Sequence, residues 1–190
     1  MNIMPGSGHL LSGQTVYVKL RFVEEGGERR RPRTIEDLLV RGEDGAQLGG
    51  IKMANGTNPM RAAPFAGTRG KAAAMVREQF IKAQEYARKV AAAEREDGTI
   101  DESKLPARDL AMEALGEVLD GTFIVHHHTH RADDLMTVLR LAREFKFRVV
   151  LHHVSEAWKV ADEIAQAQRD GVVIGCSVIL IDSPGGKLEA

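Results

Sequence analysis

The chain has 190 residues and a formal net charge of −1, with 43% hydrophobic and 28% charged residues. This balance is typical of a globular protein and excludes an intrinsically disordered one. Neither sign of charge is in excess, so the composition gives no indication of nucleic acid or a membrane surface as a partner. The length predicts a single domain over residues 1–190, with two domains as the alternative.

The cysteine count and the apolar runs bear on localisation. The one cysteine, Cys176, cannot form a disulfide within the chain, so nothing indicates an oxidising compartment. No apolar run approaches the roughly 18 residues of a membrane span, and the first residues lack the pattern of a signal peptide. We therefore expect a cytoplasmic protein. Residues 1–4 resemble the tail of a strand entering a loop, so we also expect that the natural beginning lies further upstream.

The first 40 residues are predicted to contain one clear strand. Residues 5–13 form a glycine-rich loop that does not match the spacing of nucleotide-binding loops. Residues 15–22 alternate apolar and polar side chains, as a half-buried strand does. Residues 24–34 are charged and rich in turn formers, which favours a solvated loop over an anion site at its arginines. Residues 35–40 predict a short helix or strand.

Residues 50–55 predict a short buried strand that contains Lys52. Lysine is rarely buried without a functional reason, but a side chain that reaches past the strand end to water would explain Lys52 equally well. Residues 56–70 form a long loop rich in glycine and proline. Loops of this length are uncommon unless they cover a site or are mobile.

Two helices are predicted next. Residues 71–94 form the longest one, with an apolar stripe made of Val76, Phe80, Ala87 and Val90. Pro106 is expected to open a second helix that ends near Leu119. Its inward-facing residues are predicted to be Leu110, Ala114, Leu115 and Val118.

Six of the seven histidines lie within residues 122–155. Residues 123–125 and 148–151 are strand-like, and each run continues into histidines. The apolar residues between them recur at helical spacing, which predicts a strand, a helix and a second strand. The histidines are His126, His127, His128, His130, His152 and His153.

The spacing of these histidines predicts a metal site. His153 follows His128 by 25 residues, about one β-α unit, and parallel strands end at the same edge of a sheet, where α/β proteins bind their ligands. Imidazole is a common ligand for zinc, iron and nickel. Alternation along the strand would place His126, His128 and His130 on one face and His127 on the other. Histidines that only pack and hydrogen-bond, or a surface histidine tract, are the alternatives.

The C-terminal part predicts one more helix and strand. Ser155 is expected to cap a helix that Gly171 ends, with inward-facing Trp158, Ala161 and Ile164 or Ala165. Residues 172–174 begin a strand, and residues 177–181 are a further apolar run. The Gly-Gly-Lys of the tail lacks the remaining residues of a phosphate-binding loop, so we expect no nucleotide site there.

Strands near residues 15, 50, 122, 147 and 172 alternate with helices, which predicts an α/β fold with a parallel sheet. A complete (β/α)8 barrel needs roughly 250 residues. The chain is therefore expected to form a partial (β/α)8, TIM-barrel-like arrangement.

Two histidine segments, HTHRADD at 128–134 and VLHHVSEAWKVADEIA at 150–165, resemble the metal-dependent amidohydrolase superfamily. The similarity is to its imidazolonepropionase-like and Xaa-Pro-dipeptidase-like branch. Residues 5–21 and 51–59 are similar to that branch as well, so the resemblance covers nearly the whole chain. It implies a (β/α)8 barrel with one or two metal ions at the carboxyl ends of its strands, of which this chain would supply about strands 2–7.

The resemblance also suggests roles for individual residues. The family takes metal ligands from an HxH pair on strand 1, often a carboxylated lysine on strand 4, histidines on strands 5 and 6, and an aspartate on strand 8. His128 matches the strand 5 ligand, His153 matches the strand 6 ligand, and Lys52 lies where the strand 4 lysine would be sought. His130 resembles a position near the substrate. No roles follow for His126, His127 and His152.

The chain departs from the family pattern at both ends. No HxH pair precedes Lys52 and no strand 8 aspartate follows the histidines. His128-Thr129-His130 could itself be taken for the strand 1 pair, although the order Lys52, His128, His153 favours strand 5. The chain alone is therefore expected to bind metal weakly and turn over little.

The resemblance implies a hydrolase that cleaves amide-type C–N bonds of a small-molecule substrate through a metal-activated water, with zinc as the expected divalent metal. No catalytic residue is assigned. We expect no nucleic-acid or membrane partner, and assembly into a homo-oligomer stays open. A metal phosphoesterase on a similar barrel, or a non-catalytic barrel-derived module whose histidines only pack, are the alternatives.

Overall fold

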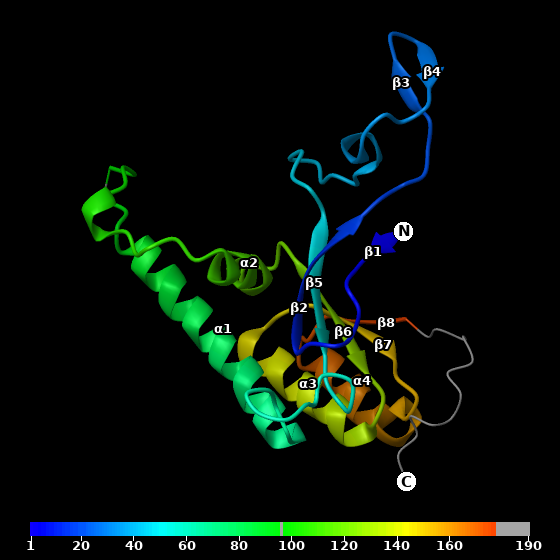
Figure 1. Ribbon diagram of the computed structural model, residues 1–190, viewed down its shortest axis with the longest axis vertical. Coiled ribbons are helices and arrows are strands. Elements are labelled where there is room, and N and C mark those ends of the chain that lie inside the picture. Colours follow the sequence, from blue (N-terminus) through cyan, green and yellow to red (C-terminus); the bar gives the residue numbers. More distant parts are fainter. Residues whose placement is uncertain (96, 178–190) are drawn as a thin grey trace.

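A curled six-stranded sheet is the centre of the computed structural model, which describes residues 1–95 and 97–177 (Figure 1). Strands β5, β6, β7 and β8 are parallel, whereas β2 is antiparallel to β5 and β1 is antiparallel to β2. The predicted α/β class and partial-barrel arrangement are therefore confirmed in outline, as a mostly parallel half barrel. In spatial order the strands are β1 (Asn2–Ile3), β2 (Leu11–Tyr17), β5 (Gly49–Ala54), β6 (Ile124–Thr129), β7 (Val149–His153) and β8 (Ile174–Ser177).

The curvature of the sheet can be judged from one contact. Asn2 on β1 lies 3.1 Å from the Nε2 atom of His126 on β6, although two strands separate β1 from β6. In a flat sheet three strand spacings would keep these backbones roughly 14 Å apart. The sheet therefore folds toward itself, and we call its concave side the inner face.

The strand predicted at residues 15–22 is the main departure from the expected topology. It runs from Leu11 to Tyr17 and pairs antiparallel with β5. Residues 18–48 contain no crossover helix; they form an arm that leaves the sheet and returns to it (Figure 1). Parallel pairing requires a crossover that carries the chain back to its starting edge, so a chain that returns where it left must pair antiparallel.

The arm is more ordered than the predicted solvated loop. It contains the hairpin of β3 (Val23–Glu25) and β4 (Glu28–Arg30), followed by the short 3-10 helix η1 (Ile35–Leu38). Arg30 binds the carboxylate of Asp37 through two nitrogens, at 3.0 and 3.1 Å, and Glu25 at 2.5 Å. Its guanidinium holds the pKa of Asp37 below the usual range of a carboxyl group. The guanidinium of Arg30 thus forms its ion pairs within the arm, where it stabilises the fold of this segment.

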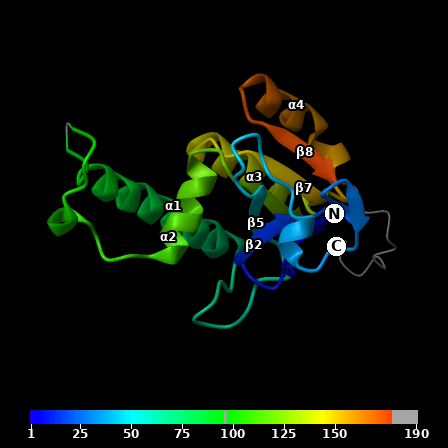
Figure 2. The ribbon, with the colours of Figure 1, turned by 90° about the horizontal axis from the view of Figure 1, so that it is seen from above.

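The helices gather on the outer side of the sheet, as the view from above shows (Figure 2). Strands β5 and β6 are joined through α1 (Arg69–Ala91), the 3-10 turn η2 (Glu102–Lys104) and α2 (Leu110–Leu119). Helix α3 (Ala132–Phe145) joins β6 to β7. The 3-10 turn η3 (Ala157–Val160) and helix α4 (Ala161–Arg169) join β7 to β8. The predicted strand, helix and strand around the histidines are confirmed.

The hydrophobic core fills the space between these helices and the outer face of the sheet. Met53, Val125 and Leu151, from three adjacent strands, belong to one buried cluster with residues of α1, α2 and α3. Within it Phe80 of α1 stacks on Phe145 and Phe147, with ring centroids 5.0 and 5.3 Å apart. This packing fixes the strands, and with them the residues on the inner face.

Several local predictions were wrong. Helix α1 buries Ala72, Val76, Phe80 and Ala83, while the predicted Ala87 is exposed, because the C-terminal half of α1 extends beyond the sheet (Figure 1). Helix α2 begins at Leu110 rather than at Pro106, since Asp109 caps it by accepting hydrogen bonds from two backbone amides. Leu110 is 68% exposed.

The segment after β7 also differs from expectation. Trp158 is 76% exposed and lies beneath the ammonium of Lys159 instead of packing inward. Ala161 is exposed, and the buried residue of α4 is Ala167. Ser155 caps no helix. Residues 178–181 of the predicted apolar run, and the Gly-Gly-Lys of the tail, lie outside the described residues. Among the helices that are described, none has the length and apolar character needed to cross a membrane.

Replacing Phe80 by Ala is expected to lower the free energy of unfolding by about 3–5 kcal/mol, because it leaves a cavity where the ring is fully buried between two others. Urea denaturation followed by circular dichroism measures the change. Trp158→Ala is the matched control, since it removes a larger but exposed ring and should cost less than about 1 kcal/mol. Similar losses for both variants would contradict this description of the core.

Candidate metal centre

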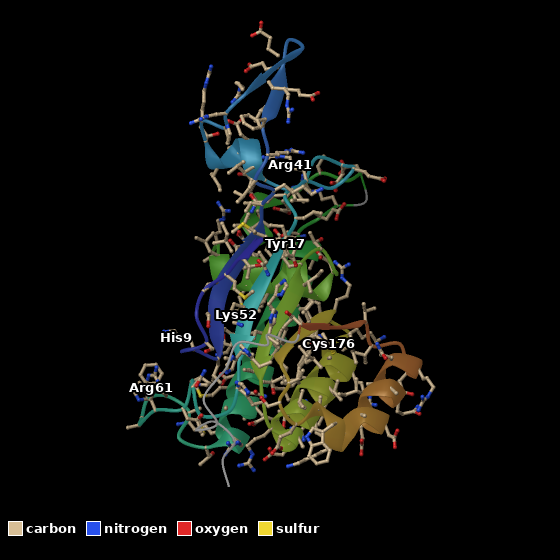
Figure 3. The ribbon with its side chains drawn as sticks, turned by 90° about the vertical axis from the view of Figure 1, so that its right-hand side faces the viewer. His9, Tyr17, Arg41, Lys52, Arg61 and Cys176 are labelled. Atoms are coloured by element: carbon tan, nitrogen blue, oxygen red, sulfur yellow. The ribbon has the colours of Figure 1, made fainter. Side chains whose placement is uncertain are left out.

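Backbone register places four polar side chains on the inner face of the sheet. Lys52 on β5 is aligned with His126 on β6, and His128 on β6 is aligned with His152 on β7. Aligned residues of neighbouring strands point to the same face. All four side chains are buried. Lys52 lies in the middle of its strand, away from the strand ends, and is only 4% exposed (Figure 3). The alternative that Lys52 reaches past the strand end to water is therefore wrong, because its side chain is buried.

His127 points to the opposite, outer face, as alternation along the strand predicted. It lines a small pocket together with Ala72, Val76 and Leu141 of helices α1 and α3. Its Nδ1 atom lies 3.1 Å from the backbone oxygen of His128. Full burial among apolar side chains lowers the pKa of His127 to about 3, so this residue is a neutral part of the core.

Three histidines converge beyond the carboxyl ends of β6 and β7. His128, His130 and His153 each offer one ring nitrogen, and these three atoms lie within 4.8 Å of one another. The ring centroids are 4.7 Å apart for His128 and His130, 4.5 Å for His128 and His153, and 4.9 Å for His130 and His153. We call this group the histidine cluster. The sequence had paired His128 with His153 and placed His130 near the substrate; the structure brings all three together.

His153 reaches the cluster because the backbone is kinked at the end of β7. His152 lies on the inner face, so regular alternation would point His153 outward. Instead His153 and Val154 have φ angles of 72° and 47°, a conformation that costs non-glycine residues of order 1–3 kcal/mol each. The amide of Val154 donates to the backbone oxygen of Thr129 at 3.0 Å and holds the kink. Strained residues of this kind concentrate at functional sites.

His130 is held by the segment that follows β7. Its Nδ1 atom lies 2.8 Å from the hydroxyl of Ser155, and its backbone oxygen accepts from the amide of Glu156 at 3.0 Å. The carboxylate of Glu156 accepts from the amide of Ala132 at 2.9 Å. Ser155, which the sequence suggested as a helix cap, therefore orients a member of the cluster.

Asn58 contacts His128, another member of the histidine cluster. Its Nδ2 atom lies 2.9 Å from Nε2 of His128 and 2.7 Å from the hydroxyl of Ser7. Asn58 belongs to the long loop after β5, and Ser7 to the loop before β2. The sequence left open whether this long loop covers a site or is mobile, and it did not single out Asn58, because nothing in the local pattern marks this residue.

A second polar chain lies deeper on the inner face. The hydroxyl of Tyr17 lies 2.5 Å from Nε2 of His126, and Nδ1 of His126 lies 3.0 Å from Nε2 of His152. Burial, with the nearby charge of Lys52, lowers the pKa of both histidines to about 4. Burial also lowers the pKa of Lys52 and raises that of Tyr17. Sequence reasoning had left His126 and His152 without a role and had missed Tyr17.

Gly50 is required for the close packing around this chain. A Cβ atom at Gly50 would overlap the backbone oxygen of Ile124 and would lie 3.0 Å from Cδ2 of His126. Since two of the three nearest atoms are backbone atoms of Ile124 in β6, no side-chain rotation could make room for it. The missing side chain thus lets β5 and β6 bring Lys52 and His126 together.

A small pocket adjoins the histidine cluster. His128 and His130 line it together with Asn58, Arg131 and the ion pair of Arg69 with Asp134, whose Nε and Oδ2 atoms are 3.1 Å apart. Burial raises the pKa of the Asp134 carboxyl, and the guanidinium of Arg69 opposes this shift. A larger hollow of about 700 Å³ lies between α1 and α2, but none of the cluster histidines lines it. The chemistry-bearing groups therefore point to the smaller pocket.

The histidine cluster fits a divalent cation. Three protein ligands with an open fourth position are typical of catalytic zinc sites, and three histidines form one of the known sets. Zinc–nitrogen bonds of about 2.0–2.1 Å place tetrahedral ligand atoms closer together than the 4.8 Å limit found here. Side-chain rotations would close that difference. Neutral imidazoles would leave the full positive charge of the ion available for chemistry.

Comparisons with known proteins identify one similar solved structure. The crystal structure of an amidohydrolase from Thermotoga maritima MSB8 matches with a TM-score of 0.65 and 28% sequence identity. The match covers 98% of this chain and 52% of the other, so this chain spans about half the length of its structural relative. No protein-family model and no curated protein matches. The likeness agrees with the amidohydrolase superfamily but does not reach the imidazolonepropionase-like branch.

Metal-free protein is expected to lose stability as the pH falls from about 6.5 to about 4. His126, His127 and His152 have depressed pKa values in the folded state, so over this range the unfolded chain binds more protons and is favoured. Their full contribution is present above pH 6.5. One pKa unit corresponds to about 1.4 kcal/mol, and we expect a loss above ~2 kcal/mol in urea titrations at pH 7.5 and 4.5. His127→Leu should reduce this loss of stability, whereas His9→Ala, at an exposed site, should leave it unchanged. An equal loss between pH 7.5 and 4.5 in the unaltered protein and both variants would show that burial of His127 is not its cause.

Gly50→Ala is expected to destabilise the protein by about 1–3 kcal/mol or more, because the added methyl group overlaps the backbone of β6. Gly116→Ala in α2 is the control. A Cβ atom there meets nothing within 4 Å, so the helix should gain roughly 0.5–1 kcal/mol. Thermal unfolding monitored by circular dichroism should shift in opposite directions for the two variants, and a shift in the same direction would contradict the packing described here.

Proposed function

We propose that this protein is a metal-dependent hydrolase that cleaves amide-type C–N bonds in small molecules, with zinc as its metal. The convergence of His128, His130 and His153 at the carboxyl edge of a parallel sheet carries the proposal. Ligand and active sites of barrel folds lie at this edge. The likeness to an amidohydrolase from Thermotoga maritima supports the same class of reaction.

The three histidines of the cluster would hold the cation. A bound zinc ion would supply Lewis acidity toward a carbonyl group and would lower the pKa of a coordinated water. The chain's own contribution would be to fix the three imidazoles, through Asn58 at His128, Ser155 at His130 and the kinked backbone at His153. The adjoining pocket, where His130 and Arg131 lie beside the cluster, has a volume of about 10 Å³, which is room for roughly one water molecule.

Lys52 would be a further participant in the metal centre, as the family resemblance implies. Lys52 on β5 is aligned with His126 on β6, and His126 precedes the cluster histidine His128 by two residues. Burial lowers the pKa of Lys52 and so favours the neutral amine, which is the form that can be carboxylated or can bind a cation. The proposal that Lys52 joins the ligand set rests on this burial and on the resemblance together.

The finer assignment to the imidazolonepropionase-like and Xaa-Pro-dipeptidase-like branch remains a proposal based on the sequence segments around the histidines. It would make cyclic amides or dipeptides the substrates. A phosphoesterase is less well supported, because the histidine cluster contains no carboxylate that could bridge two ions. A non-catalytic module would not need the strained backbone at His153 and Val154.

Metal analysis tests the proposed site directly. After dialysis against a fixed zinc concentration, which suits the weak binding expected of this chain alone, His128→Ala and His153→Ala should each hold at least about tenfold less zinc than the unaltered protein, since each removes one of three ligands. His9→Ala is the matched control, because it removes an exposed histidine outside the cluster. Unchanged zinc content in both cluster variants would support the packing-only alternative.

A hydrolysis panel tests the reaction class. In excess zinc the chain is expected to act slowly on dipeptides or N-acyl amino acids and to leave aryl phosphates untouched, with activity lost in His128→Ala. Turnover of the aryl phosphates alone would favour a phosphoesterase. Metal binding without turnover of any compound would favour a non-catalytic module.

A further inference from the structure

Asn58 connects three parts of the chain that meet at the metal centre. Its side-chain amide lies between Nε2 of His128 on β6, at 2.9 Å, and the hydroxyl of Ser7, at 2.7 Å. Ser7 precedes β2, and Asn58 follows β5. The role that these contacts give to Asn58 rests on the proposed metal-dependent function.

The loop holds the Asn58 amide in a fixed place. Pro59 follows directly and is buried, and a proline restricts the backbone of the residue before it to extended conformations. The backbone oxygen of Asn58 accepts from Arg61 at 3.0 Å. Figure 3 shows Arg61 at the same end of the sheet as His9, where the two loops meet.

The start of the loop is tied to the strands and helix around the site. The backbone amide of Asn55 donates to the backbone oxygen of His128 at 3.2 Å, and its side chain donates to the backbone oxygen of Asp134 at 2.9 Å. Asn58 is therefore not a surface residue that happens to reach His128. Its position is set on one side by the hydrogen bonds of Asn55 to the segments around the cluster and on the other by the Arg61 contact within its own loop.

The chemistry of an amide suits this position. A neutral imidazole carries its proton on one nitrogen and offers the other as an acceptor or ligand. Histidine ligands of metals usually donate the second ring N–H to an oxygen acceptor, which fixes their orientation. An amide can donate through nitrogen or, after turning over, accept through oxygen, and the two orientations differ little in electron density or shape. Ser7 can likewise donate or accept, so both partners of the amide can reverse together.

We propose that Asn58 is a positioning residue of the metal centre, which holds Nε2 of His128 so that the ring presents Nδ1 to the cation. In the metal-free chain the amide N–H donates to Nε2, and the ring proton lies on Nδ1. Binding of a cation at Nδ1 would require the other tautomer: solvent would accept the Nδ1 proton and supply one to Nε2, so that the imidazole stays neutral. The amide then turns over, and its oxygen accepts from both His128 and Ser7.

Two variants separate this role from simple anchoring of the loop. Asn58→Asp keeps the shape but can only accept, so it should favour the Nε2–H form of His128 that the metal requires. Asn58→Leu keeps approximate size and can neither donate nor accept. Thr57→Val is the matched control, since Thr57 is exposed in the same loop. A residue that only anchors the loop would give the same result in both Asn58 variants.

The experiment measures cobalt affinity, from the visible absorption of the bound ion, and the ring ¹⁵N signals of His128 in the full chain. Asn58→Leu is expected to weaken cobalt binding about 10–100-fold, whereas Asn58→Asp should bind at least as tightly as the unaltered protein. In metal-free protein, Asn58→Asp should move the ring proton from Nδ1 to Nε2. Thr57→Val should match the unaltered protein in both readouts.

Contrary outcomes are equally specific. Cobalt affinities within twofold of one another in both Asn58 variants, with unchanged ring signals, would overturn the role of Asn58. Metal bound through Nε2 would do so as well. Failure of the unaltered protein to bind cobalt would count against the proposed function, while the ring signals of the metal-free variants would still decide what Asn58 does. If Asn58→Leu fails to fold, the isosteric Asn58→Asp variant provides both measurements.

Discussion

In the parallel ladder between β6 and β7, His128 lies opposite His152 and Thr129 lies opposite His153. This register fixes which imidazoles share the inner face and leaves His153 on the wrong side of its strand. The left-handed backbone at His153 and Val154 resolves the conflict by turning the His153 ring into the cluster. A shift of one residue in the register would move every side chain of β7 to the other face, and the histidine cluster could not form.

The inner face is unusual for the interior of a sheet because it is polar and because, among residues 1–95 and 97–177, no buried carboxylate forms an ion pair with Lys52. Lys52, His126 and His152 are buried beside one another. Burial disfavours the charged forms of such bases, so the pKa values of all three fall. Such a group of buried nitrogen bases is poorly suited to an ordinary core, and its histidines, with pKa values of about 4, are neutral near pH 7 and can act as metal ligands. The Tyr17 hydroxyl and the Asn2 amide both lie at hydrogen-bonding distance from one of these nitrogens, Nε2 of His126.

Long-range contacts complete the site. Ser7, Asn58 and Ser155 come from three separate loops, and each contacts either a cluster histidine or the residue that holds one. These loops lie at the carboxyl edge of the parallel strands, where the chain enters or leaves the sheet. The outer face, packed through Phe80 and its two stacked neighbours, keeps that edge in one geometry. Rigid strands thus supply the ligands, and loops supply their orientation.

The sequence by itself determined the elements whose signals are local. Hydrophobic runs that end in histidines predicted β6 and β7, helical spacing predicted α3, and alternation correctly placed His127 on the outer face. Local patterns could not show that β2 runs antiparallel, because that depends on the path of the arm between residues 18 and 48. They also could not show that Trp158 is exposed or that Ser155 and Asn58 contact histidines far away in the chain. Those features depend on the curvature of the sheet and on the strained turn after β7, which arise only when distant segments pack together.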